Sequence, residues 1–467
     1  MSRAFDALSA LELRALIVAR HISPVELVQR ALQRIEETEP HINAFAHVDA
    51  TSALIAAREA ERKVLAGEPL GLLHGLPVSV KDLLAVAHMP WRFGSWTEGD
   101  RVATFDCPAV ERIRAQGGCI LGKTTTSEFG CKAVGDSPRH GATRNPWDLS
   151  RTAGGSSAGA AASVACGVSA LALGTDGGGS VRIPAAMNRL VGFKPSLGRV
   201  PFFPAAATPS LAHIGPLTRT VRDAALLLQA VSGFDPRDPH SLSDPVPDFL
   251  KACERPLGRL RIAWSPTLGY AKVDPRVLAV AERAAKVFNA LGCEVEEVSW
   301  TLPDPHPLWA EAFYGGVAQR LRDAMTTCPD RLDPAVLPFL QAASRQSPVG
   351  GEVLAQRRAG VDQALTSLFA QYDLLLTPTL PISAPPVGPS IPEGHEDRDP
   401  IGWSYYTYPF NLTGQPAVSI PAGQTVEGLA VGLQLIAPMH HEALLFSAAA
   451  AFEQAQPWAR ELPLAHL

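Results

Sequence analysis

Residues 151–184 read RTAGGSSAGAAASVACGVSALALGTDGGGSVRIP, two glycine-flanked serine clusters joined by a small, apolar segment. The alanine run that starts after Ser157 predicts a buried helix ending near Cys166, and the apolar run 169–174 predicts a buried strand. A glycine loop follows this strand, and a second helix is expected to open near Ser180. Polar groups at such junctions between strands and helices are typical of an α/β fold.

The sequence on both sides of this stretch repeats the alternation of strands and helices. A β-type run ends in Lys81-Asp82, and the pattern then predicts a helix over 108–116 and a strand over 119–123. Farther along, strands are predicted at 260–264, 293–298 and 373–378, and a long amphipathic helix at 276–291. The stretch 306–358 reads as mostly helical. The chain closes with two strand patterns, AVSIP and AVGLQLI, and a helix over 442–454.

The first 70 residues are helical in pattern. A helix start is marked by Ser23 as the N-cap, Pro24 in the first turn and Glu26 as the partner in a capping box. We therefore expect an N-terminal pair of helices before the first strand.

Composition describes a compact globular chain. Of its 467 residues, 46% are hydrophobic and 19% are charged, and 41 basic against 46 acidic residues give a net charge of -5 without a basic stripe. Nucleic acid is therefore not an expected partner. Charges at Glu12, Arg14 and Arg20 interrupt the N-terminal apolar residues, and the apolar stretch 160–174 is too short for a membrane span. Seven scattered cysteines without a CxxC pair favour a reducing cytoplasm and indicate no metal site.

Ser180 is the best candidate nucleophile because it follows Gly177, Gly178 and Gly179. Without side chains, the backbone N–H groups of such a loop can converge on one point and hold an oxyanion. The same loop is also compatible with a phosphate site or a simple tight turn.

Lys81 and Ser156 complete the candidate chemistry. Lys81 ends an apolar run, so it is expected to be buried, and desolvation would turn it into a usable base. A hydroxyl at Ser156 placed between Lys81 and Ser180 would relay a proton. The alternative role for a serine in this cluster is a helix N-cap, which fits Ser157 best.

These residues resemble the amidase signature family, serine hydrolases of amide bonds. The resemblance rests on GLPVSVKD around Lys81, GATRNPWDLSRTAGGSSAGAAASVA around Ser156, LGTDGGGSVRIPAA around Ser180, and the C-terminal PFNLTGQPAVSIPAG and VGLQLIAP. It covers nearly the whole chain. It implies a single large α/β domain, 1–467, in which helices cover both faces of a mixed, twisted sheet. Within it we expect N-terminal helices (1–70), a catalytic core (71–235), a variable helical middle (300–372) and C-terminal strands with a helix (373–467).

The resemblance also implies a role for each matching residue. Ser180 would be the nucleophile, Ser156 a serine on a cis peptide bond, and Lys81 the general base. The backbone amides of Gly177, Gly178, Gly179 and Ser180 would form the oxyanion hole, and Asp176 and Arg182 would brace the loop beside Ser157. The chain departs from the family pattern at Arg189, where glycine is common.

The resemblance leaves the substrate open. Aromatic residues gather at Trp91, Phe93 and Trp96, at Trp309, Phe313 and Tyr314, and between Trp403 and Phe410, so a pocket for apolar or aryl groups is one interpretation. Phe129, Gly130 and Cys131 are candidate substrate contacts from the family position.

The first functional hypothesis is a hydrolase of small to medium amides, extending to anilides, esters or carbamates. The alternative is the glutamine-hydrolysing subunit of a tRNA-dependent amidotransferase. We expect a small-molecule amide as the substrate, no cofactor and no metal, and a homodimer remains open.

Overall fold

The computed structural model describes residues 5–345, 351–458 and 462–464. The predicted segments 1–70, 306–358 and 373–467 therefore include a few residues outside the described part of the chain. The helices are α1 (Ala10–Val18), α2 (Pro24–Ile42), α3 (Ala50–Ala66), α4 (Pro108–Ala115), α5 (Ala158–Ala165), α6 (Arg182–Met187), α7 (Val221–Val231), α8 (Phe249–Ala252), α9 (Pro275–Ala290), α10 (His306–Arg320), α11 (Arg322–Thr327), α12 (Leu337–Arg345), α13 (Gly351–Phe369), α14 (Pro409–Leu412) and α15 (Glu442–Ala455).

One mixed sheet of 11 strands crosses the molecule in the order β1-β3-β2-β8-β10-β9-β14-β15-β13-β11-β12. Strands β2, β3 and β8 pair in parallel, the central strands pair antiparallel, and β11 pairs in parallel with β12 and β13. The strands of the sheet are β1 (Phe45–Val48), β2 (Pro77–Lys81), β3 (Cys119–Thr124), β8 (Leu171–Asp176), β9 (Val191–Lys194), β10 (His213–Thr218), β11 (Arg261–Trp264), β12 (Glu294–Glu297), β13 (Leu374–Pro378), β14 (Ala417–Gln424) and β15 (Ala430–Ile436).

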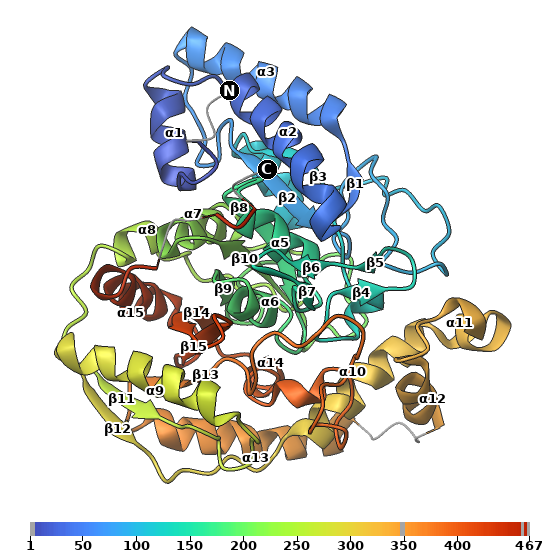
Figure 1. Ribbon diagram of the computed structural model, residues 1–467, viewed down its shortest axis with the longest axis vertical. Helices are drawn as coiled ribbons and strands as arrows, with labels where there is room; N and C mark the ends of the chain where they lie inside the picture. Colours follow the sequence, from blue (N-terminus) through green and yellow to red (C-terminus); the bar gives the residue numbers. More distant parts are fainter. Residues whose placement is uncertain (1–4, 346–350, 459–461, 465–467) are drawn as a thin grey trace.

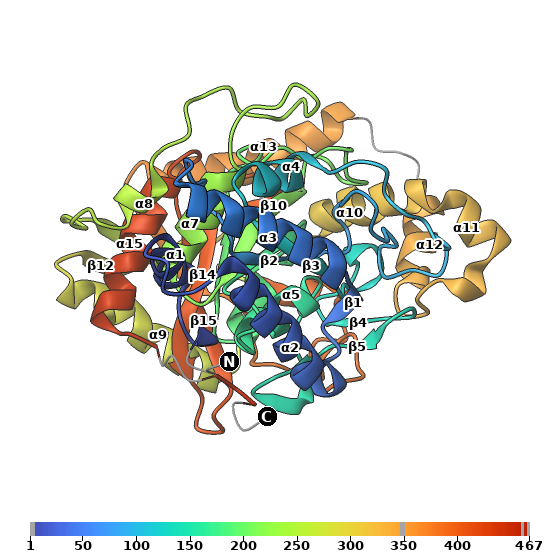
Figure 2. The same cartoon turned by 90° about the horizontal axis from the view of Figure 1, so that it is seen from above.

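Helices cover both faces of this sheet (Figure 1). Strand β3 is an example. Its side chains alternate between the two faces of the sheet, and each face carries apolar ones that need to be covered. Cys119 and Leu121 pack in a cluster with residues of α2, α3 and α5, whereas Ile120 packs with the larger core on the other face. Helices α11 and α12 lie at the end of the molecule opposite α9 and α15 in both views (Figures 1 and 2). The prediction of one α/β domain with a mixed sheet is confirmed.

The N-terminal prediction is confirmed where its signals are strong. Ser23 caps α2 with both hydrogen bonds of a capping box, the second donated by its own backbone N–H to the Glu26 carboxylate at 3.0 Å. The sequence did not reveal the short edge strand β1 between α2 and α3. It also did not reveal the small hairpins formed by β4 (Asp136–Ser137) with β5 (Gly141–Ala142) and by β6 (Arg144–Asn145) with β7 (Asp148–Thr152).

The pairing of β2 with β8 positions the candidate site. The two strands run side by side in parallel, with Val80 opposite Leu173. Their carboxyl ends therefore meet at one edge, where Lys81 closes β2 and Asp176 closes β8. None of the helices in the described residues is both long and apolar enough to cross a lipid bilayer.

Candidate active site

The Lys81 side chain is fully buried at the end of β2. Its Nζ lies 2.7 Å from Ser156 Oγ, 2.9 Å from Ser157 Oγ, and 3.0 Å and 3.4 Å from the hydroxyl and carbonyl oxygens of Thr175. All four neighbours are uncharged, so no direct partner among the described residues would neutralise an ammonium group at this position.

Burial lowers the pKa of Lys81 well below its usual value, because the charged form loses its hydration. The carboxylate of Asp176 acts in the opposite direction but does not offset this effect. The side chain is therefore suited to act as a neutral amine, which can accept a proton from one hydroxyl while it donates to others.

Two neighbouring serines face this amine. The peptide bond between Gly155 and Ser156 is cis, as the resemblance implies. Ser157 occupies the N-cap position of α5, yet its side chain makes no capping hydrogen bond. Its hydroxyl instead donates to the Thr175 carbonyl at 3.2 Å, which leaves its oxygen able to accept from Lys81. The N-cap role expected for Ser157 is therefore wrong as far as its side chain is concerned.

The backbone N–H groups of the glycine loop differ in whether they already have a hydrogen-bond partner. The Gly179 N–H donates to Asp176 Oδ1 at 2.7 Å, so it is already engaged. The N–H groups of Gly177, Gly178 and Ser180 have no hydrogen-bond partner among the described residues. These three donors are free to bind an anion, whereas Gly179 contributes to the loop itself.

Asp176 and Arg182 hold the loop from behind. The guanidinium makes two hydrogen bonds to the carboxylate, at 3.0 Å from Nε and 2.9 Å from Nη2, and both side chains are fully buried. Burial alone would raise the pKa of Asp176, but Arg182, helped by Lys194 and a hydrogen bond from Asn411, keeps it below its usual range. The carboxylate is thus charged and able to fix the loop amides.

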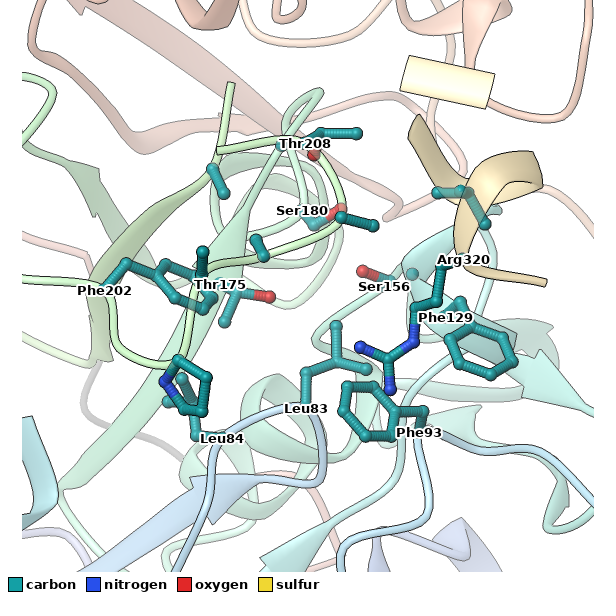
Figure 3. Close-up of a pocket in the computed structure, with 18 of the residues that line it drawn as sticks. Leu83, Leu84, Phe93, Phe129, Ser156, Thr175, Ser180, Phe202, Thr208 and Arg320 are labelled. Carbon is teal, nitrogen blue, oxygen red and sulfur yellow. The ribbon is translucent and has the colours of Figure 1, made fainter. Parts of the chain in front are cut away.

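Ser156 and Ser180 open into a pocket with a largely apolar wall. In Figure 3 they lie between Phe202 on one side and Phe93 with Phe129 on the other. No hydrogen bond joins the two serine hydroxyls in the described structure. The larger apolar and aromatic side chains of the wall are Leu83, Leu84, Trp91, Phe93, Phe129, Phe202, Phe203, Phe313 and Val317. Smaller apolar residues complete it, and Arg320 is among the remaining residues.

Some of the aromatic residues expected at the pocket line it, and others do not. Trp91, Phe93 and Phe313 line it, as do the expected contacts Phe129 and Gly130. Cys131 is buried outside the lining, and burial raises the pKa of its thiol well above the usual value. The other candidate aromatics are absent from the described lining: Trp96, Trp309, Tyr314, Trp403, Tyr405, Tyr406, Tyr408 and Phe410.

Sequence reasoning missed Phe202, Phe203 and Arg320 as pocket residues. The run FFP at 202–204 was an available signal, since it places two large apolar side chains in a loop, and binding residues lie disproportionately on loops. Arg320 carried no such signal, because a basic residue in the last turn of a helix is an ordinary feature.

Arg189, where the chain departs from the family pattern, combines an unusual backbone conformation with side-chain contacts. Its backbone has a φ of 59°, the left-handed region in which glycine is favoured. The guanidinium lies 3.8 Å from the ring centroid of Trp147, and its Nη2 donates to the Gly428 carbonyl at 3.1 Å. These contacts accompany an arginine in a backbone conformation that suits glycine.

A family model for amidases matches residues 26–446, a range that contains all of these site residues. The chain belongs to the amidase signature family. It is thus an enzyme of the amidase class, and its large mixed sheet with helices on both faces is the fold of solved amidase signature enzymes.

Individual amidase signature proteins resemble it along almost its whole length. It is 38% identical over 464 residues to an acylamidase of Rhodococcus erythropolis, covering 98% of this chain and 97% of that protein. It is 33% identical over 487 residues to a glutamyl-tRNA(Gln) amidotransferase subunit from Trichodesmium erythraeum, covering 96% and 98%. Among solved structures, a bacterial aryl acylamidase matches with a TM-score of 0.89 and 33% identity, covering 97% of this chain and 96% of that one.

Proposed function

We propose that this amidase hydrolyses small to medium apolar or aryl amides through an acyl-enzyme on Ser180. One observation carries the proposal: Ser156 and Ser180 open into an aromatic pocket, while a buried Lys81 lies 2.7 Å behind the Ser156 hydroxyl. The similarity to acylamidases supports the same substrate class. Anilides, esters and carbamates fit the same route, since each presents a carbonyl carbon with a leaving group.

The proposed reaction starts with proton transfer along three residues. Neutral Lys81 takes a proton from Ser156 as Ser156 takes one from Ser180, and the Ser180 oxygen attacks the substrate carbonyl carbon. Free amides of the glycine loop hold the resulting oxyanion. The relay then runs backwards and protonates the departing amine as the C–N bond breaks. Water then attacks the acyl-enzyme ester on Ser180 through the same proton relay, and the carboxylic acid is released.

Pocket charge argues against the amidotransferase alternative. Free glutamine carries an ammonium group that needs an acceptor or an anionic partner in an apolar site. Among the described residues of the lining, the acidic side chain is Asp176, and its carboxylate is already bound by Arg182 and Asn411. An aryl or alkyl acyl group makes no such demand.

A substrate panel tests the proposal directly. Acetanilides, aliphatic amides, carbamates, esters and glutamine are offered to the purified chain, with Ser180→Ala as the blank. We expect anilide turnover by the native enzyme, none by Ser180→Ala, and labelling by a fluorophosphonate that disappears in the variant. Glutamine hydrolysis that appears only with a partner protein would support the amidotransferase alternative instead. Labelling that persists in Ser180→Ala would exclude Ser180 as the nucleophile.

A further inference from the structure

The backbone of the glycine loop is in direct contact with a tryptophan from a distant helix. Trp309, in α10, donates its indole N–H to the Gly177 carbonyl, with 3.0 Å between Nε1 and O. A Cβ added at Gly178 would lie only 2.6 Å from the same ring. The fully buried ring therefore packs on the loop backbone itself, and only glycine leaves it room.

The geometry of a peptide unit gives this hydrogen bond a second effect. In a planar trans unit the C=O and the following N–H point in opposite directions. The cis bonds of the described chain are Gly155-Ser156 and Phe203-Pro204, so the unit joining Gly177 to Gly178 is trans. Trp309 holds the carbonyl end of that unit, and the Gly178 N–H at the other end has no partner in the described structure. The indole thus sets the direction of one free donor.

The next peptide unit behaves differently. Its carbonyl, on Gly178, accepts from the Thr407 hydroxyl at 2.6 Å, and its N–H, on Gly179, donates to Asp176. Both ends are engaged, so this unit offers no donor to a ligand. The unit held by Trp309 therefore joins a tethered carbonyl to a free N–H. The units that end at the Gly177 and Ser180 N–H groups do the same, since their carbonyls accept from Asn411 Nδ2 at 2.8 Å and from the Ile183 N–H at 2.7 Å.

We propose that Trp309 is a positioning residue for oxyanion binding. By holding the Gly177 carbonyl, it aims the Gly178 N–H at the oxygen that becomes negative when Ser180 attacks the substrate. The proposal rests on the proposed function, because it requires acyl transfer to Ser180. Trp309 touches no reacting atom, and it is stacked between Phe313 and Tyr408, with ring centroids at 4.8 Å and 5.4 Å.

Trp309→Phe tests the role of the N–H, because phenylalanine keeps a stacked ring and removes the donor. With 4-nitroacetanilide we expect kcat to fall by about 10- to 100-fold and KM to stay unchanged, somewhat less than the effect of deleting an oxyanion donor outright. Phenylboronic acid, which forms a tetrahedral adduct on a serine oxygen, should lose affinity by the same factor. The product 4-nitroaniline should bind as before. If this variant does not fold, benzothienylalanine at 309 keeps the ring shape and replaces the N–H by sulfur.

Trp403→Phe is the matched control. Trp403 is equally buried, and its indole N–H donates to a backbone carbonyl, that of Pro400 at 3.2 Å, away from the pocket lining. This variant should leave kcat, KM and boronate affinity unchanged. Equal losses in both variants, or equal losses of boronate and nitroaniline affinity in Trp309→Phe, would reduce Trp309 to a packing role and overturn the inference. Native rates in Trp309→Phe would also overturn it. An inactive native enzyme would instead refute the proposed function, and this inference with it.

Discussion

The Lys81 amine lies 2.7 Å from the Ser156 hydroxyl, and its other hydrogen-bonding neighbours in the described structure are neutral as well. An ammonium group in this position would be desolvated without a carboxylate in contact. The arrangement therefore favours the neutral amine, and pH becomes a direct probe of the site.

The first prediction concerns the pH dependence of Lys81. Because burial lowers its pKa, kcat/KM should rise with pH through that pKa and reach its plateau well below pH 10.5. Lys81→Met should fold and lose about 10³-fold or more of the activity. Lys123→Met, which removes a second buried lysine on the neighbouring strand β3, should keep the acid limb of the profile. Near-native rates in Lys81→Met at neutral pH would rule out Lys81 as the base.

The pH dependence of protein stability should also reflect the ionisation of Lys81. Between the lowered pKa of folded Lys81 and the usual value near 10.5, the unfolded chain binds the extra proton. Stability of the native enzyme therefore rises with pH in this window and is lower on its acid side. Lys81→Met lacks this dependence. The unfolding free energy of the variant minus that of the native enzyme should therefore increase as the pH falls through this window. Denaturant unfolding at several pH values measures the difference.

Substitutions of Ser156 and Ser157 should change the activity by different amounts, although both side chains contact Lys81. Ser156→Ala removes the proposed relay, and we expect kcat to fall by about 10³-fold. Ser157→Ala removes only an acceptor that stabilises the protonated amine. We expect a loss of about 10-fold or less, with the acid limb of the kcat/KM profile displaced to lower pH. A displacement to higher pH would contradict donation from the Lys81 amine to the Ser157 hydroxyl.

Glu128, next to the pocket residue Phe129, should make stability depend on pH. Its buried carboxyl accepts from the Ser95 hydroxyl and the Asp333 N–H, both at 2.6 Å, and burial raises its pKa to about 7. Above pH 4.5 the unfolded chain loses this proton first, so native stability should fall up to about pH 7 and then level off. Relative to the native enzyme, Glu128→Gln should therefore gain about 1–3 kcal/mol between pH 5 and pH 8. A difference that does not vary with pH would refute this prediction.

Arg320 is the charged side chain that reaches the pocket from α10. Its guanidinium lies 4.2 Å from the ring centroid of Phe93 and also contacts Glu98 at 3.1 Å. We expect Arg320→Met to raise KM for a carboxylated acetanilide by about 3- to 10-fold, and more at low salt, while acetanilide itself is unaffected. Arg101→Met is the control, because Arg101 pairs with the same Glu98 outside the lining. Equal changes for both substrates would argue for packing alone.

The sequence predicted those parts of the fold that depend on local signals. The capping box at Ser23, the buried strand ending in Lys81 and the alternation around Ser180 are all encoded within a few residues. Ser157 was misassigned because an N-cap and a buried hydroxyl look alike in sequence, and the amine that binds it lies 76 residues upstream.

The pocket wall was harder to predict for the same physical reason. Phe202 comes from a loop and Arg320 from the end of α10, and only tertiary packing brings them to the same pocket. The sequence patterns mark which residues are buried, but which buried ring faces the serines depends on how α10 and the loop that carries Phe202 pack around the pocket. The late aromatics around Tyr405 illustrate this point, since they are buried in a cluster away from the pocket.

Strands β2 and β8 pair directly, and each carries one half of the site at its end. The distance between the amine and the glycine loop is thus determined by the ladder of backbone hydrogen bonds between these two interior strands of the sheet. Segments of this kind are the last to open in a native protein. Thermal inactivation should consequently coincide with cooperative melting, and turnover should persist until the central strands themselves separate.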